Sequence, residues 1–225
     1  MVMEAGQTDT PTRFSIDRTQ ASHMPREKST VKPAAAGAGK PKTDLTRLVA
    51  LLRGINVGGH AIIPMADLCE AFVVAGASDV RTYIQSGNVV FDVSAKGFAA
   101  FDKRIRQWLE KTAGENSAIA YRSASEICAL ADAFPFSTYA SESEVKTYVA
   151  FLECLPEKSP ALPLFSKKEG LEVLALHDGK DALVLSRRVG DRWGFPNALV
   201  EKTFGVAATS RNWNTVTRLA SMCRE

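Results

Sequence analysis

The chain has 225 residues, 45% of them hydrophobic, and a formal net charge of +3. This length suits one large domain or two small ones, and no apolar run approaches the roughly 20 residues that a membrane-spanning helix needs. Residues 1–43 also lack the apolar segment of a secretory signal. We therefore expect a cytoplasmic protein that does not enter a membrane.

The surplus of positive charge lies entirely in residues 1–43. This segment holds seven Lys/Arg and four Asp/Glu, which leaves 21 residues of each sign in the rest of the chain. A neutral body lacks the basic surface that nucleic acid requires, so we do not expect it to bind nucleic acid. The segment is rich in Pro, Ala, Gly and Lys and has little to bury, which predicts a disordered tail.

The cysteines and histidines are too scattered to suggest a shared site. They form no C-x-x-C pair and no metal-ligand spacing, and the sequence shows no dinucleotide fingerprint. We therefore predict reduced thiols, no metal site and no cofactor. The residues concerned are Cys69, Cys128, Cys154, Cys223, His23, His60 and His177.

The first part of the body predicts a strand, a helix, two strands around a turn, a helix and a strand. Residues 48–52 are apolar on both faces, as in a central strand. An amphipathic stripe follows Pro64, and Ser86-Gly87 is a hairpin signal. This is the β-α-β-β-α-β order of ferredoxin-like folds. The expected elements span residues 45–53, 64–75, 80–85, 88–93, 98–113 and 118–121.

A linking helix and a second run of the same elements are predicted to follow. Ser123 and Glu126 form a capping box, so a helix should run from there to about residue 133. A second hairpin is expected at Asp178-Gly179, and Asn214 should cap a final helix. The other elements are predicted at residues 145–154, 161–168, 171–177, 182–187, 197–204 and 206–211, and Val216, Leu219 and Ala220 should face inward.

The predicted fold class is α+β, with two consecutive ferredoxin-like β-α-β-β-α-β units packed together behind the tail. Units this small bury only about 60–65% of their unfolded surface, so docking would stabilise both. The repeat concerns the order of elements, because the halves show no residue-level identity. The boundaries are 1–43 for the tail, 44–122 for the first unit, 123–144 for the linking helix and loop, and 145–225 for the second unit with its C-terminal helix.

The topology predicts a ligand site at one end of the first sheet. Strands one and two of a ferredoxin-like sheet run parallel, so the loop after the first and the turn after the second lie at the same end. A small polar or anionic ligand is expected there. Alternatively, these glycines and asparagines serve only turn geometry. The residues are Arg53, Asn56, Gly58, Gly59, Gln85, Ser86, Gly87 and Asn88.

A second polar stretch lies near the C-terminus and has two interpretations. It could be a recognition patch with a stacking ring, or a helix cap in which Trp213 locks the two halves together. The candidate residues are Arg211, Asn212, Trp213, Asn214 and Thr215. Binding of RNA to the sheet is not supported, because the strand at residues 45–53 has no aromatic residue.

Three segments, at residues 51–59, 80–91 and 209–217, resemble a bacterial domain-of-unknown-function family, DUF1697. The resemblance covers roughly residues 46–223 and leaves out the tail. It implies two ferredoxin-like subdomains, and since the family has no established activity it implies no catalytic residues.

Two functions of different classes remain open. The first is a non-catalytic module that binds a small polar or anionic ligand. The second is an enzyme in which Arg53 and Asn56 stabilise charge while Arg211 or His60 assists. An enzyme predicts a deep cleft between the halves with a strongly perturbed titratable group. The sequence carries no signal for an oligomeric state.

Overall fold

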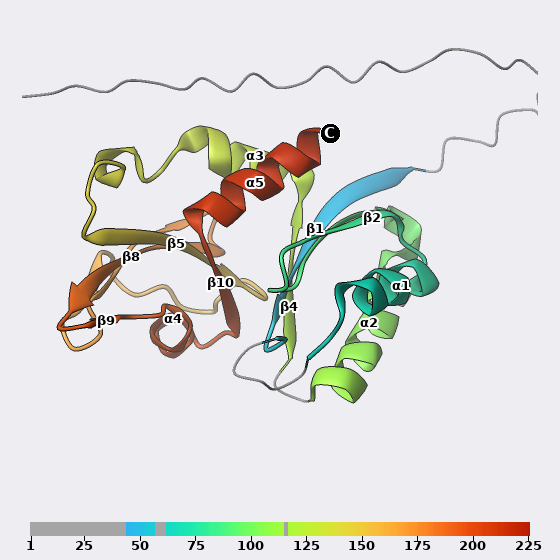
Figure 1. Ribbon diagram of the computed structural model, residues 1–225, viewed down its shortest axis with the longest axis horizontal. Helices are drawn as coiled ribbons and strands as arrows, with labels where there is room; N and C mark the ends of the chain where they lie inside the picture. Colours follow the sequence, from blue (N-terminus) through green and yellow to red (C-terminus); the bar gives the residue numbers. More distant parts are fainter. Residues whose placement is uncertain (1–43, 57–61, 115–116) are drawn as a thin grey trace, which may run out of the picture. The chain divides into compact units, whose positions relative to one another are not determined.

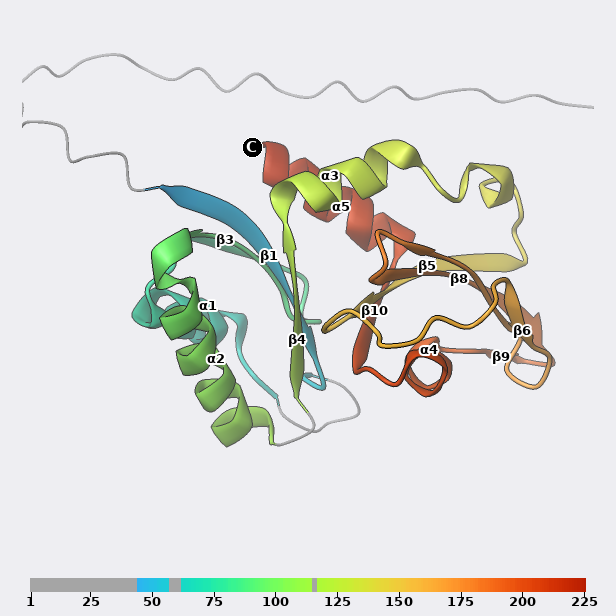
Figure 2. The ribbon, with the colours of Figure 1, turned by 180° about the vertical axis from the view of Figure 1, so that it is seen from behind.

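The computed structural model describes residues 44–56, 62–114 and 117–225, and the structural statements below concern these residues. They form two antiparallel sheets that pack against each other, with helices on the outer faces (Figures 1 and 2). The predicted tail at 1–43, and the candidates Gly58, Gly59 and His60, lie outside the described residues.

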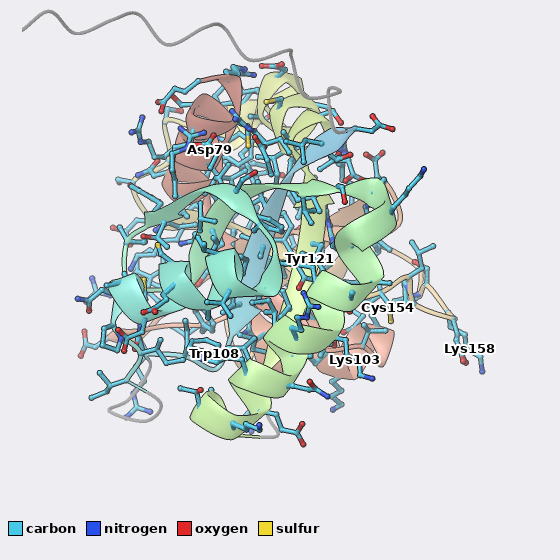
Figure 3. The ribbon with its side chains drawn as sticks, turned by 90° about the vertical axis from the view of Figure 1, so that its right-hand side faces the viewer. Asp79, Lys103, Trp108, Tyr121, Cys154 and Lys158 are labelled. Carbon is cyan, nitrogen blue, oxygen red and sulfur yellow. The ribbon has the colours of Figure 1, made fainter. Side chains whose placement is uncertain are left out.

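Every element predicted for residues 45–121 is present, and the four strands among them form the first sheet. Its spatial order is β2-β3-β1-β4, so β1 and β2 both run antiparallel to β3, which lies between them. α1 and α2 lie together on its outer face, with Tyr121 of β4 beside α2 (Figure 3). The elements are β1 (Leu45–Arg53), α1 (Met65–Ala75), β2 (Ser78–Tyr83), β3 (Asn88–Ser94), the short 3-10 helix η1 (Ala95–Gly97), α2 (Phe98–Ala113) and β4 (Ala118–Ser123).

The β2–β3 turn is longer than predicted. It occupies four residues, with Ile84 at φ 50° and Gly87 at φ 73°. A Cβ atom on Gly87 would lie 2.8 Å from side-chain atoms of both Leu52 and Ile55, so only glycine fits. The close packing of this turn on the end of β1 fixes where the two meet.

The second sheet has the order β10-β5-β8-β7-β6, and β9 pairs with β8. Its strands are antiparallel, and α4 covers its outer face. The hairpin predicted at Asp178-Gly179 is present, with both residues at positive φ. The elements are β5 (Val145–Leu152), β6 (Leu164–Ser166), β7 (Leu171–His177), β8 (Asp181–Val189), β9 (Arg192–Trp193), α4 (Asn197–Phe204) and β10 (Ala208–Asn212).

The helix predicted at residues 161–168 is wrong, and with it the full β-α-β-β-α-β order of the second half. An extended segment occupies this region and forms β6, which pairs with β7. Pro163 disfavours a helical conformation at the preceding residue, Leu162, which fits the non-helical backbone observed there.

Two further helices, α3 (Ala124–Ala133) and α5 (Trp213–Arg224), lie side by side across the junction of the sheets (Figure 1). A short 3-10 helix, η2 (Ser137–Tyr139), follows α3. α3 starts with the predicted capping box. α5 is capped by Asn212 rather than Asn214, because Asn212 keeps the extended backbone of an N-cap and its Oδ1 accepts from Thr215 N–H at 2.8 Å.

The central core belongs to both sheets at once. It contains inward-facing residues of β1 and β5 together with residues of α3 and α5, and Val216, Leu219 and Ala220 face inward as predicted. Trp213 is only 9% exposed, and its ring centroid lies 5.3 Å from that of Phe136. Trp213 therefore packs in the core that joins the halves.

No helix in the described part of the chain has the length and apolarity needed to cross a bilayer. The four cysteines are unpaired.

Candidate ligand-binding site

The loop after β1 and the β2–β3 turn meet at one end of the first sheet, as chain direction predicted. Leu52 N–H donates to Gly87 O at 2.8 Å. Asn56 Nδ2 donates to Gln85 O at 2.8 Å and to Ile63 O at 3.0 Å, and its Oδ1 accepts from Ile63 N–H at 2.7 Å. These bonds join the loop to the turn, so the side chain of Asn56 is engaged with backbone groups.

A cavity of about 540 Å³ lies beside this end, between the first sheet, β10 and the start of α4. Five of the candidate residues from the sequence line it: Arg53, Ser86, Arg211, Asn212 and Thr215. The rest of its lining was not predicted: Leu52, Gly54, Ile55, Ile84, Tyr148, Phe195, Asn197, Thr209 and Ser210. The sequence signal for Ser210 was its place in the polar stretch, whereas Tyr148, Phe195 and Asn197 come from distant segments.

Arg211 carries a buried positive charge into the wall of this cavity, since the residue is only 7% exposed. Its Nε donates to Asn88 Oδ1 at 2.5 Å, and its Nη2 donates to Leu52 O at 2.8 Å and Ser86 O at 2.9 Å. Its Nη1 donates to Thr209 Oγ1 at 2.6 Å and to the Ser210 carbonyl at 3.0 Å.

All of these acceptors are neutral, and no ion pair joins Arg211 to a carboxylate in the described ranges. Burial lowers the pKa of Arg211 to about 10. Buried arginines are normally paired with an acid, because a desolvated charge without one is costly. The cavity therefore has a positive wall that the described residues do not neutralise.

Two polar atoms on the same cavity have no hydrogen-bond partner within the described residues. They are Ser210 Oγ and Asn197 Oδ1, and both are buried. Each such atom costs about 1–3 kcal/mol when left unsatisfied. Together they supply a donor and acceptor groups that a ligand could satisfy.

Part of the cavity lining is apolar, and one of its residues has a strained backbone. Ile84 lies at φ 50° and is 51% exposed, although a β-branched residue rarely adopts this conformation. Phe195 is 57% exposed, and its ring lies 5.9 Å from that of Tyr148 in an edge-to-face arrangement. Burial raises the pKa of Tyr148. These residues add apolar surface to the lining of the cavity.

Arg53 is engaged with Glu201 of α4. Its Nε lies 2.9 Å from Glu201 Oε1 and its Nη2 lies 3.0 Å from Oε2, so the pair is bidentate. Glu201 Oε1 also accepts from Ala208 N–H at 2.9 Å. Arg53 thus ties the end of β1 to the second half with its charge compensated.

The other candidates serve the turn or lie elsewhere. Asn88 is fully buried, and its Nδ2 donates to Tyr83 O at 3.0 Å and Ser86 Oγ at 3.1 Å. Gln85 and Asn214 are exposed and Gly87 is buried, and none of these or Trp213 lines the cavity.

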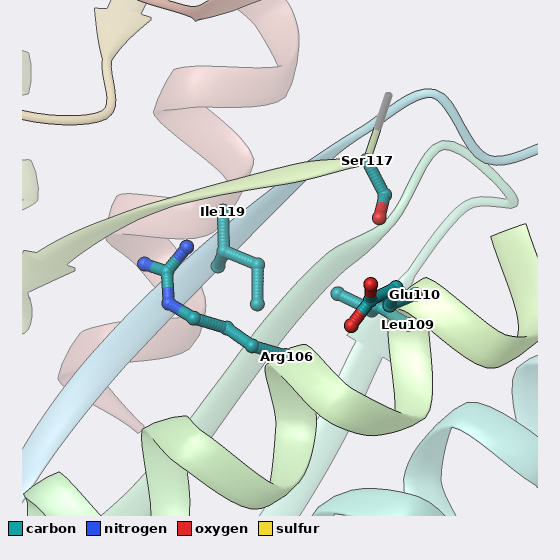
Figure 4. A pocket seen from close by; sticks show the side chains of 5 residues that line it. All are labelled: Arg106, Leu109, Glu110, Ser117 and Ile119. Carbon is teal, nitrogen blue, oxygen red and sulfur yellow. The ribbon is translucent and has the colours of Figure 1, made fainter. Parts of the chain in front are cut away.

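A smaller hollow of about 190 Å³ lies between α2 and the start of β4 (Figure 4). It is lined by Arg106, Leu109, Glu110, Ser117 and Ile119. The guanidinium of Arg106 lies 2.9 Å from Asp102 and 2.5 Å from Glu153. Its charge is compensated, so this hollow lacks the feature that distinguishes the larger cavity.

The titratable side chains in the described lining of the larger cavity are those of Arg53, Tyr148 and Arg211. This described lining contains no carboxylate, imidazole or thiol. Elsewhere in the described ranges, no group of three or more His, Cys, Asp or Glu side chains could hold a metal ion.

Comparison with known proteins identifies a family and a similar fold. A family model described as a protein of unknown function (DUF1697) matches residues 45–180. The fold is similar to that of the conserved bacterial protein SP0830 from Streptococcus pneumoniae, with a TM-score of 0.53 and 21% identity. That match covers 80% of this chain and 99% of the other. No curated protein matches the sequence.

Proposed function

The chain belongs to the DUF1697 family of proteins of unknown function, which provides no activity to transfer, and from the geometry we propose a non-catalytic binding module. Its ligand is a small polar or anionic molecule held in the cavity beside Arg211. The observation that carries this proposal is the burial of the Arg211 guanidinium with only neutral oxygens around it among the described residues.

An anion in the cavity would compensate this charge. At about 5 Å and an effective dielectric constant of about 20, a unit anion gains about 3 kcal/mol from a unit cation. The N–H groups of Arg211 already donate to protein oxygens, so Arg211 would act through its charge. The direct hydrogen bond to the anionic group would come from the Ser210 hydroxyl, whose buried oxygen lacks a partner among the described residues. Asn197 Oδ1 can only accept, so it would bond an N–H or O–H group elsewhere on the ligand.

The test is thermal unfolding with inorganic phosphate, small mono- and dicarboxylates and nucleoside monophosphates. A ligand at about 100 times its Kd should stabilise the protein by about 2.7 kcal/mol. Ser210→Ala should reduce this stabilisation, whereas Thr217→Ala removes an exposed hydroxyl from α5 and should not. No stabilisation by any compound, or an equal one in Ser210→Ala, would contradict the proposal.

The ferredoxin-like description of both halves also belongs to this proposal. It is supported by the strand orders, since β2-β3-β1-β4 and β7-β8-β5-β10 are the same order counted from each half. On this interpretation β6 and the irregular segment before it replace the first helix of the second unit, and the boundaries remain 44–122, 123–144 and 145–225. A cytoplasmic location is supported by the unpaired cysteines.

A further inference from the structure

Arg122, on the last strand of the first sheet, reaches into the second sheet. Its Nε donates to Asp181 Oδ1 at 2.8 Å, and its Nη2 donates to Leu152 O at 2.9 Å and Lys180 O at 3.0 Å. Its Nη1 donates to the carbonyl of the preceding residue, Tyr121, at 2.6 Å. Arg122 therefore joins the end of β5 to the β7–β8 turn.

Arg211, on β10, makes the same set of contacts in the opposite direction. Its Nε donates to Asn88 Oδ1, and its Nη2 donates to Leu52 O and, at 3.3 Å, to Gly87 O. Its Nη1 donates to the carbonyl of the preceding residue, Ser210. Each half thus inserts one arginine between the first strand and the hairpin turn of the other half.

The equivalence extends to the backbone around each arginine. Leu52 N–H donates to Gly87 O at 2.8 Å, and Leu152 N–H donates to Lys180 O at 3.0 Å. The registers agree as well. Leu48 of β1 lies opposite Ser123, the N-cap of α3, as Tyr148 of β5 lies opposite the N-cap of α5, Asn212. The two sites can therefore be compared residue by residue.

The sites differ at the third residue of the helix that follows. In α3 this residue is Glu126, whose Oε2 accepts from Ser123 N–H at 2.7 Å and whose Oε1 pairs with Lys180. In α5 it is Thr215, and only the N-cap half of the capping box is present. Thr215 is too short to return a carboxylate to the N-cap, and it lines the cavity with Asn212.

The sites around Arg122 and Arg211 also differ in charge. Around Arg122, the carboxylates of Asp181 and Glu126 balance the charges of Arg122 and Lys180. Around Arg211 the corresponding residues are Asn88, Thr215 and Gly87, none of which is charged. At these equivalent positions the second site has the arginine but neither acid nor the lysine, so the described residues compared here carry one net positive charge.

We propose that a carboxylate or phosphate group of the ligand binds at the N-terminus of α5, in the place that the Glu126 carboxylate occupies at α3. This inference rests on the proposed function and names its ligand class. The helix N-terminus favours an anion. The hydroxyl of Ser210, a residue only 6% exposed, lines the same cavity without a partner among the described residues. The rest of the ligand faces Tyr148 and Phe195.

The experiment is a titration of wild-type protein and variants with inorganic phosphate, and separately with acetate, followed by backbone amide chemical shifts. In the wild type, the amides of residues 212–215 should shift and saturate with at least one of the two anions. Thr215→Glu supplies the missing carboxylate from the chain and should weaken that binding by about tenfold or more. Thr217→Glu adds the same charge at an exposed position of α5 and should have a much smaller effect.

The outcomes separate this inference from the proposed function. Shifts at Ser210 and Asn197 without shifts at residues 212–215 would overturn the assigned place and leave the proposed function standing. An absence of shifts around the whole cavity with both anions would overturn the inference. Equal affinity in Thr215→Glu and wild type would also overturn it.

Thr215 is buried, so Thr215→Glu could disturb folding. A second variant therefore tests the inference at the equivalent position of the first half. Glu126→Thr removes the carboxylate at α3 and leaves Lys180 unpaired beside the vacated place. Phosphate should then shift the amides of residues 123–125, which it should leave unchanged in the wild type. A folded Glu126→Thr protein without those shifts would contradict the inference.

Discussion

Arg122 and Arg211 each extend from the last strand of one sheet into the other sheet, but among the described residues only Arg122 meets a carboxylate there. Arg122 lies 2.7 Å from Asp181, and both side chains are almost fully buried. Burial raises the pKa of Asp181 despite this contact, and burial lowers the pKa of Arg211 to about 10. The two guanidinium groups thus make equivalent hydrogen bonds, but among the described residues only that of Arg122 has a carboxylate beside it.

The comparison separates what the fold requires from what a ligand would require. Both arginines satisfy carbonyl groups at a strand end and a hairpin turn, so these bonds serve the junction of the sheets. A carboxylate is needed only to balance charge, and Asp181 of the second half provides one for Arg122. Its absence beside Arg211 among the described residues is therefore not explained by the fold. A cavity lies beside each arginine, but the one beside Arg122 is lined by the Glu126 carboxylate, whereas the described lining beside Arg211 contains no carboxylate.

The largest expected effect comes from removing each arginine. Arg122→Met leaves Asp181 buried and unpaired and should lower the free energy of unfolding by about 3–5 kcal/mol. Arg211→Met leaves only neutral acceptors unpaired and removes an unbalanced charge, so it should cost less, about 1–3 kcal/mol. Urea unfolding monitored by circular dichroism measures both. Equal losses would mean that the two arginines do not differ in charge compensation.

Arg218→Met is the control, because this side chain is half exposed and its contact with Glu225 is 3.5 Å long. An exposed pair of this kind contributes about 0–1 kcal/mol.

The fold could be predicted wherever local patterns determine an element. The apolar run at residues 48–52, the capping box of Ser123 and Glu126 and the turn at Asp178-Gly179 each correspond to an observed element. The meeting of the β1 loop with the β2–β3 turn followed from strand direction alone. The helix predicted at residues 161–168 is wrong because the order of elements in the first half was expected to repeat there, although Pro163 disfavours a helical conformation at Leu162.

The candidate site could be predicted only in part, because its character depends on contacts between distant segments. The polar stretch pointed to Arg211, but nothing in the sequence shows that its acceptors would be carbonyls of β1 and the β2–β3 turn. Tyr148, Phe195 and Asn197 reach the cavity through the packing of the second sheet. The equivalence of Arg122 and Arg211 was also missed, because their neighbours differ in sequence.

The next largest effect compares two buried serines. Ser210 Oγ has no partner among the described residues, whereas Ser186 Oγ donates to Gly194 O at 2.9 Å. Without ligand, Ser210→Ala should raise the free energy of unfolding by about 1 kcal/mol, because it removes an unsatisfied group. Ser186→Ala should lower it by about the same amount. A loss of stability in Ser210→Ala would mean that its hydroxyl already has a partner.

Substitutions in the two hairpin turns should change the stability of the protein by a smaller amount. Ile84 at φ 50° and Asp178 at φ 47° lie in corresponding turns of the halves. Ile84→Gly should stabilise the protein by about 1 kcal/mol, because a β-branched residue is strained at positive φ. Asp178→Gly should gain less, since aspartate tolerates this conformation. Thermal unfolding of the two variants tests the order, and a larger gain at Asp178 would contradict the greater strain assigned to Ile84.

The smallest effect is a difference in pH dependence between the helix N-termini. Burial disfavours ionised Glu126, but Lys180 and the Ser123 N–H outweigh it and lower the pKa of Glu126 below 4.5. A lowered pKa means that the unfolded state binds the proton more tightly. The stability from Glu126 is therefore present above the ordinary pKa of glutamate and is lost as the pH falls through the folded value.

Glu126→Gln should remove that part of the acid dependence, while its amide can still accept from the N-cap. An ion pair this exposed contributes about 0.2–1 kcal/mol, so denaturant unfolding must be followed from neutral to acid pH. Thr215→Glu should add a new loss of stability at acid pH in the second half. If the free energy of unfolding had the same pH dependence in wild type and Thr215→Glu, the N-terminus of α5 would not favour a carboxylate. The N-termini of α3 and α5 would then not be electrostatically equivalent.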